Sequence, residues 1–339
     1  MKLTMRKIAE MVGVSMTTVS LVLNNKNVRI SKDKMQQIKD IAKKYNYVPN
    51  SSAVSLAKNK SNTIGVVVPN INNPFYSALI KAVSDDLGEL GYYALTINTD
   101  DDHEHEKRQI QQLINRGVDG ILLVPTNDLY SHGTASVDEF LNNIKIPFVL
   151  VNADSKLAIN QVNLDSFQGG YLATKSLIEY GHSRIAIVTG KPGFVNAENR
   201  LNGYKEALAE NHIPFDNKLV FRADYSVNGG YSIISKIRNH PNISAIFFCN
   251  DLMLYGAIKK TNKQQVNLFN LYSVVGYDDS YFNEILNPTI TSIRQDVAEL
   301  GRKSVQTLNS QIKNQKIGST IKLPVKLIIR DSIKPYNQE

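Results

Sequence analysis

The sequence has little cysteine and lacks any apolar segment long enough to cross a membrane. Cys249 is the single cysteine among 339 residues, which excludes a disulfide framework, and the apolar run Ala245–Phe248 before it predicts a buried structural thiol. No run of about 18 apolar residues occurs, and the first 20 residues alternate apolar with polar side chains. We therefore expect neither a membrane span nor a secretory signal, and we predict a globular, cytoplasmic protein with no membrane partner.

Chemical motifs of enzymes are also scarce. The segment His103–Glu106 looks rich in metal ligands, but consecutive helical residues point in different directions, so we interpret it as a solvated first turn. The segment Gly190–Gly193 lacks the spacing of a phosphate loop, and no glycine-rich dinucleotide fingerprint follows any apolar run. No nucleophile elbow or carboxylate pair stands out. We predict no catalytic residues, no cofactor and no metal.

The positive charge of the chain is concentrated at its N-terminus. Residues 1–60 hold 12 Lys and Arg against 3 Asp and Glu, whereas the other 279 residues have a net charge of −1. Neutralisation of phosphates requires a basic segment of this kind, so the distribution predicts a DNA-binding head joined to a near-neutral body. A solvated basic tail is the alternative, which the helical apolar periodicity of this segment disfavours.

Three short helices are expected in the basic head. Thr4, Ser15 and Ser31 are suited to cap their N-termini, and the second helix should span residues 16–23. The apolar positions expected on the inner faces of the first and third helices are Met5, Ile8, Ala9, Val12, Met35, Ile38, Ile41, Ala42 and Tyr45. The periodicity therefore predicts a small helical domain with its own core.

The first two helices predict a helix-turn-helix. Gly13 provides the turn between them, and the second helix of such a motif enters the major groove with its N-terminal end first. Met16 and Thr17 would then reach base edges, with Leu21 one turn further on. A three-helix module that does not contact DNA is the alternative, and the charge distribution argues against it.

The rest of the chain alternates short apolar runs with helical stretches. The runs that predict strands are Ile64–Val68, Tyr93–Ile97, Gly120–Val124, Phe148–Val151, Ile185–Thr189, Leu219–Arg222, Ala245–Phe248 and Tyr272–Gly276. Continuous apolar runs are typical of parallel strands that are covered on both faces. The body is therefore predicted to be α/β, with two doubly wound lobes of at least four strands each and a ligand cleft beyond the strand ends.

Polar and aromatic side chains follow these predicted strands. The candidate effector-binding residues are Asn73, Phe75, Tyr76, Asn152, Asn196, Arg200, Tyr225, Asn250, Asp278 and Gln295. A sugar needs such a set, because its CH faces pack on rings while Arg200 and Asp278 can each bind two adjacent hydroxyls. For Asn73, Asn152 and Asn250, capping of a turn is the structural alternative.

Several strings in this order and spacing resemble the lactose/galactose repressor (LacI/GalR) family. They are Ile8–Ala9, Gly13–Ser20, Leu23–Asn24, Tyr47–Asn50, Ser55–Ala57, Ile64–Pro69, Asn73–Tyr76, Gly117–Ile121, Gly181–His182, Val275–Asp279 and Ile329–Ser332. The resemblance covers the whole chain. It implies a helix-turn-helix head, a hinge helix, and two lobes of the type found in periplasmic binding proteins.

The resemblance also implies domain bounds and DNA contacts. We expect the head at residues 1–46, the hinge at 47–62, the first lobe at 63–162 plus 291–320 and the second lobe at 163–290 plus 321–339. The positions expected to contact DNA are Thr4, Ser15, Met16, Thr17, Thr18, Ser20, Leu21, Asn24, Arg29, Tyr47, Asn50, Ala53 and Leu56. Within the hinge, Leu56 would wedge into the minor groove, although a plain flexible linker is the alternative.

Two departures from the family pattern affect specificity. Leu21 stands where the family often has an Arg that reads guanine, so a typical family operator is not expected. Asn152 and Ala153 replace the acidic and large pair that is frequent in pentose and purine binders, which leaves the effector open.

The function implied by the resemblance is that of a ligand-controlled repressor. We expect a homodimer on a pseudo-palindromic operator, with a sugar or sugar phosphate acting more as an inducer than as a corepressor. A tetramer, a phosphocarrier coregulator and a purine effector stay open. An exported sugar-binding protein would need a signal peptide, and an enzyme would need a reactive group in the cleft; we see neither in the sequence.

Overall fold

The computed structural model describes residues 3–47, 60–153, 155–314 and 318–336. The chain divides into two compact units between Ser61 and Asn62. The predicted hinge contacts Asn50, Ala53 and Leu56 lie outside the described residues. No helix in the described ranges combines the length and the apolar character that a membrane crossing requires.

The head unit contains the three predicted helices, α1 (Met5–Val12), α2 (Met16–Leu23) and α3 (Lys32–Lys44). The caps are those expected from the sequence: Thr4 accepts from the main-chain N of Lys7 at 3.3 Å, and Ser15 accepts from that of Thr18 at 3.1 Å. Gly13 ends α1 with φ at 66°, a left-handed conformation that glycine adopts without steric cost.

The core of the head is formed by one apolar face from each helix. Ile8, Val19 and Ile38 are fully buried at its centre. One inner-face prediction is wrong, because Tyr45 is 51% exposed. Tyr45 is the residue that caps the C-terminus of α3, where the chain leaves the helical periodicity that would have turned its ring inward.

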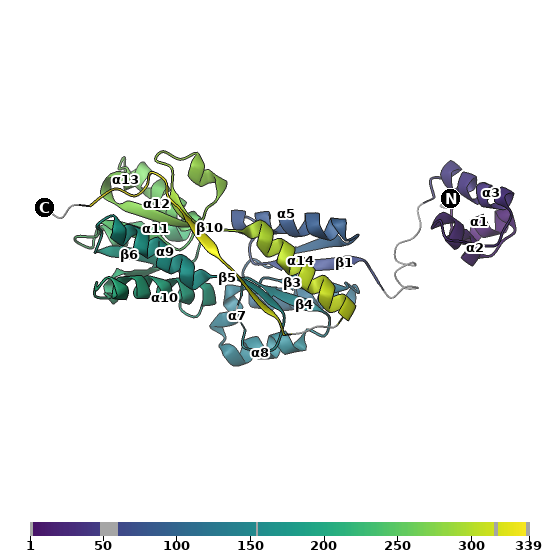
Figure 1. The fold of residues 1–339 in the computed structure, drawn as a ribbon, viewed down its shortest axis with the longest axis horizontal. Helices are drawn as coiled ribbons and strands as arrows, with labels where there is room; N and C mark the ends of the chain where they lie inside the picture. Colours follow the sequence, from purple (N-terminus) through teal and green to yellow (C-terminus); the bar gives the residue numbers. More distant parts are fainter. Residues whose placement is uncertain (1–2, 48–59, 154, 315–317, 337–339) are drawn as a thin grey trace. The chain divides into compact units, whose positions relative to one another are not determined.

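The body unit alternates strands and helices (Figure 1). Its strands are β1 (Thr63–Val68), β2 (Tyr93–Asn98), β3 (Gly120–Leu123), β4 (Phe148–Val151), β5 (Gln161–Leu164), β6 (Ile185–Thr189), β7 (Val220–Arg222), β8 (Ala245–Phe248), β9 (Ser273–Asp278), β10 (Thr291–Gln295), β11 (Thr320–Leu323) and β12 (Val325–Ile328). Its helices are α5 (Pro74–Glu89), α6 (His103–Asn115), α7 (Asn127–Ser131), α8 (Thr134–Asn143), α9 (Ser166–Glu179), α10 (Val195–Glu210), α11 (Val227–Arg238), α12 (Asp251–Lys263), α13 (Leu268–Leu271) and α14 (Val297–Asn314), with 3₁₀ turns η1 (Asn217–Leu219) and η2 (Tyr281–Glu284). Each strand predicted from the apolar runs is present, with bounds that differ by at most two residues.

The strands form two sheets, which confirms the predicted α/β class with two lobes. The first sheet has the order β11-β5-β4-β3-β1-β2 and is parallel throughout. The second has the order β12-β10-β9-β8-β6-β7, in which only the β10–β12 pair is antiparallel. In each sheet the first strand of the lobe lies between two later strands: β1 lies between β3 and β2, and β6 lies between β8 and β7. The strand order therefore reverses at β1 and at β6, and such a reversal leaves a crevice at the carboxyl ends of the strands.

The first sheet is covered by helices on both faces, because its strands are apolar on both sides. Ile64, Val66 and Val68 of β1 share one core with α5 and α14, whereas Val67 lies in a second core with α6, α7 and α8. Figure 1 shows α5 and α14 together on one side of this sheet. Side chains alternate between the faces of a strand, so one short strand contributes to both cores.

Helices α9 and α10 pack closely against one another in the second lobe, and glycines allow their close approach. A Cβ atom at Gly170 of α9 would collide with the main-chain carbonyl of Arg200, and one at Gly203 of α10 would collide with that of Phe167. Cys249 lies at the end of β8 and is fully buried, which confirms the prediction of a buried thiol.

The connections between the lobes correct the predicted boundaries. Residues 291–295, which we assign to the first lobe from the sequence, form β10 of the second sheet, so the chain crosses after Gln295. The other crossings lie at Asp165, between β5 and α9, and at Pro324, between β11 and β12. The boundary near 290 is wrong because β10 continues the second sheet beside β9 before α14 begins.

Candidate DNA-binding and effector sites

The N-terminal end of α2 presents the side chains that we expect to read DNA bases. Met16 is 53% exposed, and Thr17 beside it is also exposed. Met11 of α1 is 56% exposed, so it is the place of Met16 at the N-terminal end of α2, and not its exposure alone, that makes it a candidate for base contact. Leu21, one turn later, is half-buried. The motif therefore has the geometry that major-groove binding requires, while the individual base contacts stay predictions.

Other head residues predicted to contact DNA also have structural roles. Thr4 and Ser15 cap helices, and Ser15 Oγ lies 2.9 Å from the hydroxyl of Thr18. Asn24 closes α2, because its side-chain amide donates to the carbonyl of Ser20 at 2.7 Å. Of the remaining predicted positions, Arg29 is exposed, Ser20 is half-buried, and Tyr47 packs against the head core.

A cavity in the body brings together all ten residues predicted to bind an effector. Its volume is about 130 Å³, and it lies at the carboxyl ends of strands from both sheets. From the first lobe it is lined by Asn73, Phe75, Tyr76 and Asn152. From the second lobe, which includes β10, it is lined by Asn196, Arg200, Tyr225, Asn250, Asp278 and Gln295. The structure thus forms one site from residues far apart in the sequence; their binding of an effector stays a prediction.

Arg200 is the cation of the cavity and is held rigidly. It projects from α10, is only 5% exposed, and donates from one terminal nitrogen to the carbonyl of Cys249. Its guanidinium carbon lies 3.7 Å from the centre of the Tyr277 ring, a cation–π distance. Its Nε atom is buried without a hydrogen-bond partner among the described residues. The Nε–H group of Arg200 is therefore held in place and is available to donate to a ligand.

Asp278 lies at the end of β9 and is hydrogen-bonded to Gln295, the last residue of β10. Its carboxylate accepts from the Gln295 side chain at 2.6 Å, while Gln295 Oε1 is buried and unpaired in the described part of the chain. Burial raises the pKa of Asp278 to about 7, although the positive charge of Arg200 opposes this shift. The next residue, Asp279, forms ion pairs with Arg294 and Arg330, each at 2.6 Å. These pairs hold the turn that presents Asp278.

Of the three asparagines for which capping was the structural alternative, two cap helices and one does not. Asn73 caps α5 and Asn250 caps α12, each accepting from a main-chain N at 3.0 Å. Both therefore have the structural role and also line the cavity. Asn152 differs: its backbone has φ at 53°, its main-chain carbonyl accepts from Asn196 at 2.9 Å, and its side-chain oxygen has no partner within the described ranges.

Sequence reasoning missed several residues that line the same cavity. Asp101, Asn127 and Asp224 are among them, and Asp101 accepts from the main-chain N of Asn127 at 2.7 Å. Burial raises the pKa of Asp101. The signal for them was available, because Asp101 follows β2 and Asn127 follows β3 in the same way as the predicted residues follow other strands.

The interpretation of His103–Glu106 as a solvated first turn is wrong. Glu106 is fully buried and His103 is 8% exposed; the two side chains lie 3.1 Å apart. Glu106 accepts from the main-chain N of Thr126 at 2.9 Å and from its hydroxyl at 3.0 Å. The spacing of three residues places both side chains on the inner face of α6, where they fix the loop after β3. Among the described residues, no group of three or more potential ligands is placed to hold a metal.

Comparisons with known proteins agree with this two-part architecture. Residues 4–50 match the family of bacterial regulatory proteins, lacI family, and residues 64–316 match the periplasmic binding protein domain. The HTH-type transcriptional regulator DegA of Bacillus subtilis is 31% identical over 99% of this chain and 100% of its own length.

Two solved structures share the fold. The Lac repressor dimer bound to operator and an anti-inducer is 25% identical, with a TM-score of 0.86, over 98% of this chain and 100% of that one. A LacI family regulator from Enterococcus faecium with bound ribose is 29% identical, with a TM-score of 0.71, over 81% of this chain and 100% of that one. Because DegA aligns over both the head and the body, this chain joins the two parts in the order of a named regulator, and it is itself a transcriptional regulator of the lacI family.

Proposed function

We propose that this regulator is a repressor whose operator affinity is controlled by a monosaccharide bound in the cavity between the lobes. One observation carries the proposal: Asn152 Oδ1, Arg200 Nε and Gln295 Oε1 are buried at the same cavity without partners in the described part of the protein. Buried polar groups are nearly always hydrogen-bonded, so these atoms favour a ligand with several donors and acceptors.

The size and charge of the cavity narrow the class of ligand. The cavity volume of about 130 Å³ lies below the range of about 300–1,000 Å³ that is typical of drug-sized ligands, which favours a single sugar ring over two. Asp101, Asp224 and Asp278 line the cavity against one cation, Arg200, so above about pH 7, where Asp278 is ionised, a phosphate group would meet a net negative wall. A neutral sugar is therefore favoured over a sugar phosphate. The ribose in the Enterococcus faecium regulator supports a monosaccharide.

The ligand can be identified by its effect on thermal unfolding of the full chain. We expect one pentose or hexose to raise the melting temperature in a screen that also contains sugar phosphates, purines and disaccharides. A ligand that binds only the folded state stabilises it by about 2.7 kcal/mol at a concentration 100 times its Kd. A shift produced only by phosphorylated sugars or only by purines would reject the proposed class.

A pH dependence is expected from Asp278. The carboxylate form accepts hydroxyl donors more strongly than the protonated form, so the affinity for a neutral sugar should fall as the pH drops below about 7. The fall can reach about tenfold for each pH unit, because binding must then displace a proton. Calorimetry from pH 8 to pH 5.5 measures it, with Asp278→Asn as the control that has no proton to lose. A flat profile in the unsubstituted protein would contradict this role.

DNA binding is proposed for the exposed end of α2, with the body forming a homodimer on a pseudo-palindromic operator in the cytoplasm. The 3₁₀ turn η2 and the residue that follows it expose Tyr281, Phe282 and Ile285, and Ile285 is 72% exposed. We propose this apolar surface as part of the dimer interface, since such clusters mark interaction sites. A tetramer, a phosphocarrier coregulator and the minor-groove wedge by Leu56 stay predictions from the resemblance.

Substitutions in the head should separate base recognition from phosphate contact. We expect Thr17→Ala to change preference at one or two base pairs, by about 1–3 kcal/mol at each. Arg29→Ala should instead weaken all sequences alike and reduce the salt slope by about 1. Binding to a library of operator variants at two salt concentrations measures both, with Lys107→Ala in the body as the charge-matched control. Uniform losses from both head substitutions would contradict the division of roles.

A further inference from the structure

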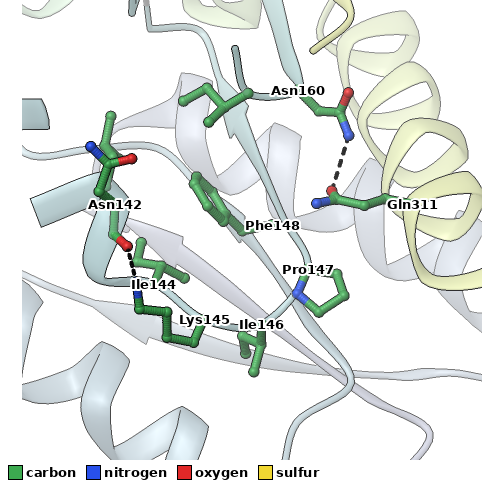
Figure 2. A pocket seen from close by; sticks show the side chains of 10 residues that line it. Asn142, Ile144, Lys145, Ile146, Pro147, Phe148, Asn160 and Gln311 are labelled. Atoms are coloured by element: carbon green, nitrogen blue, oxygen red, sulfur yellow. Dashed lines mark hydrogen bonds between the residues drawn. The ribbon is translucent and has the colours of Figure 1, made fainter. Parts of the chain in front are cut away.

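A second and larger cavity lies at the opposite end of the first lobe. Its volume is about 400 Å³, and it is lined by the connection from α8 to β4, by the residues just before β5, and by α14 (Figure 2). These segments surround the amino ends of β4 and β5, whereas the effector cavity lies at the carboxyl ends of the strands. The volume falls in the range of about 300–1,000 Å³ that is typical of small-molecule sites.

The wall of this cavity is largely apolar. Ile144, Ile146, Pro147, Phe148 and Ile159 line it, and Ile144 and Phe148 are buried even though the cavity is open. Lys145 is the one cation among the lining residues, and its ammonium donates to the carbonyl of Asn142 at 2.6 Å rather than into the cavity. The lining therefore favours a neutral molecule.

One buried amide gives the cavity a directed polar group. The main-chain N of Ser319 donates to Asn160 Oδ1 at 3.0 Å, which fixes the orientation of the Asn160 amide. Asn160 must then donate through its nitrogen, and it does so to Gln311 Oε1 at 3.1 Å. This second bond fixes the Gln311 amide as well. Its Nε2 must face away from Asn160, and Figure 2 shows this nitrogen on the side toward Phe148.

Gln311 Nε2 has no acceptor within the described ranges, and it is not one of the fully buried unpaired polar atoms there, so this nitrogen borders the open cavity. Its Oε1 atom has a structural role, because it accepts from the buried amide of Asn160. Only the Nε2 atom of the amide is left for solvent or a ligand. An oxygen atom of a bound molecule would satisfy it.

We propose that this cavity is a second small-molecule site, which binds a neutral, mainly apolar compound that presents one carbonyl or hydroxyl oxygen to Gln311 Nε2. Such a compound would lie against α14. This helix begins at Val297, two residues after Gln295, whose side chain binds Asp278 in the effector cavity. The site is nonetheless chemically distinct from the sugar site, because carboxylates and aromatic rings line the latter.

A matched pair of fluorescent probes tests the proposal on the full chain. The first is 6-propionyl-2-(dimethylamino)naphthalene, which has one ketone; the second is 2-(dimethylamino)naphthalene, which lacks it. We expect saturable binding of both. Gln311→Leu should weaken the ketone probe by roughly 3- to 10-fold and leave the other almost unchanged, since only the first probe has the carbonyl oxygen that would accept from Gln311 Nε2. Equal losses for the two probes would overturn the role of Gln311.

A substitution that fills the cavity locates the binding. Ile146 is half-buried at the rim, so Ile146→Trp should block both probes without disturbing the core. Asp278→Ala in the other cavity and Ile285→Ala on the exposed apolar surface are the controls, and both should bind the probes normally. Unchanged binding by Ile146→Trp, or no saturable binding to the unsubstituted chain, would overturn the site. Thermal melts of each variant verify that it is folded.

Discussion

A chain shortened to residues 62–339 is expected to lose specific operator binding entirely and to keep its full response to the cavity ligand. The reason is that the chain divides into two compact units at this position, and the head has its own core around Ile8, Val19 and Ile38. The head also carries the excess positive charge, while the body retains both sheets. Fluorescence anisotropy with operator DNA and thermal unfolding with the sugar measure the two halves of the prediction.

The full chain should show the salt dependence that this charge distribution implies. If a dimer neutralises six to ten phosphates, operator affinity should fall by roughly 10³- to 10⁵-fold between 50 and 200 mM salt. Sugar binding by the same protein should change little, because a neutral ligand displaces few ions. Specific binding by the shortened chain would place the DNA site in the body and reject the assignment of the head.

Asp278→Ala is expected to weaken sugar binding by about 10- to 100-fold. Hydrogen bonds to a charged group contribute about 1.5–3 kcal/mol each, and the substitution also leaves Gln295 without its partner. Operator binding without ligand should stay near normal, since Asp278 is remote in sequence from the head and its neighbour Asp279 keeps the ion pairs that hold the turn. The variant should therefore be a repressor that the sugar no longer releases.

Operator titrations with and without ligand complete this test. Linkage requires that the ligand weaken operator binding by the same factor as the operator weakens ligand binding, typically 5- to 150-fold. Asp224→Asn is a suitable control, because Asp224 also lines the cavity but is exposed. Normal sugar affinity in Asp278→Ala would remove Asp278 from the site. Tighter operator binding in the presence of sugar would make the ligand a corepressor.

The sequence predicted those parts of the structure whose causes are local. Thr4 and Ser15 have side chains that cap helices wherever a helix starts beside them, and both caps are present. Long apolar runs predicted the central strands of both sheets. The cavity could be predicted because polar residues that directly follow such strands meet at one edge, whatever the helices between them do.

The elements that were missed depend on distant partners. Strands β10 and β11 contain exposed polar residues such as Arg294 and Lys322, so their sequences lack a continuous apolar run. They are strands because a neighbouring strand offers its hydrogen bonds. Glu106 is a similar case: burial of a carboxylate is costly, and this cost is offset by His103 and by the two donors of Thr126, some 20 residues away. No local sequence pattern predicts such a distant partner.

The close packing at Gly170 has a consequence for how regulatory variants arise. Gly170 does not line the effector cavity, yet it touches the backbone of Arg200, whose side chain does. Any larger residue at Gly170 must push α10 outward and carry the guanidinium with it, while the head and its operator contacts are left intact. A genetic screen for repressors insensitive to their effector should therefore recover substitutions on the face of α9 that packs against α10, at a position outside the set of residues that line the cavity.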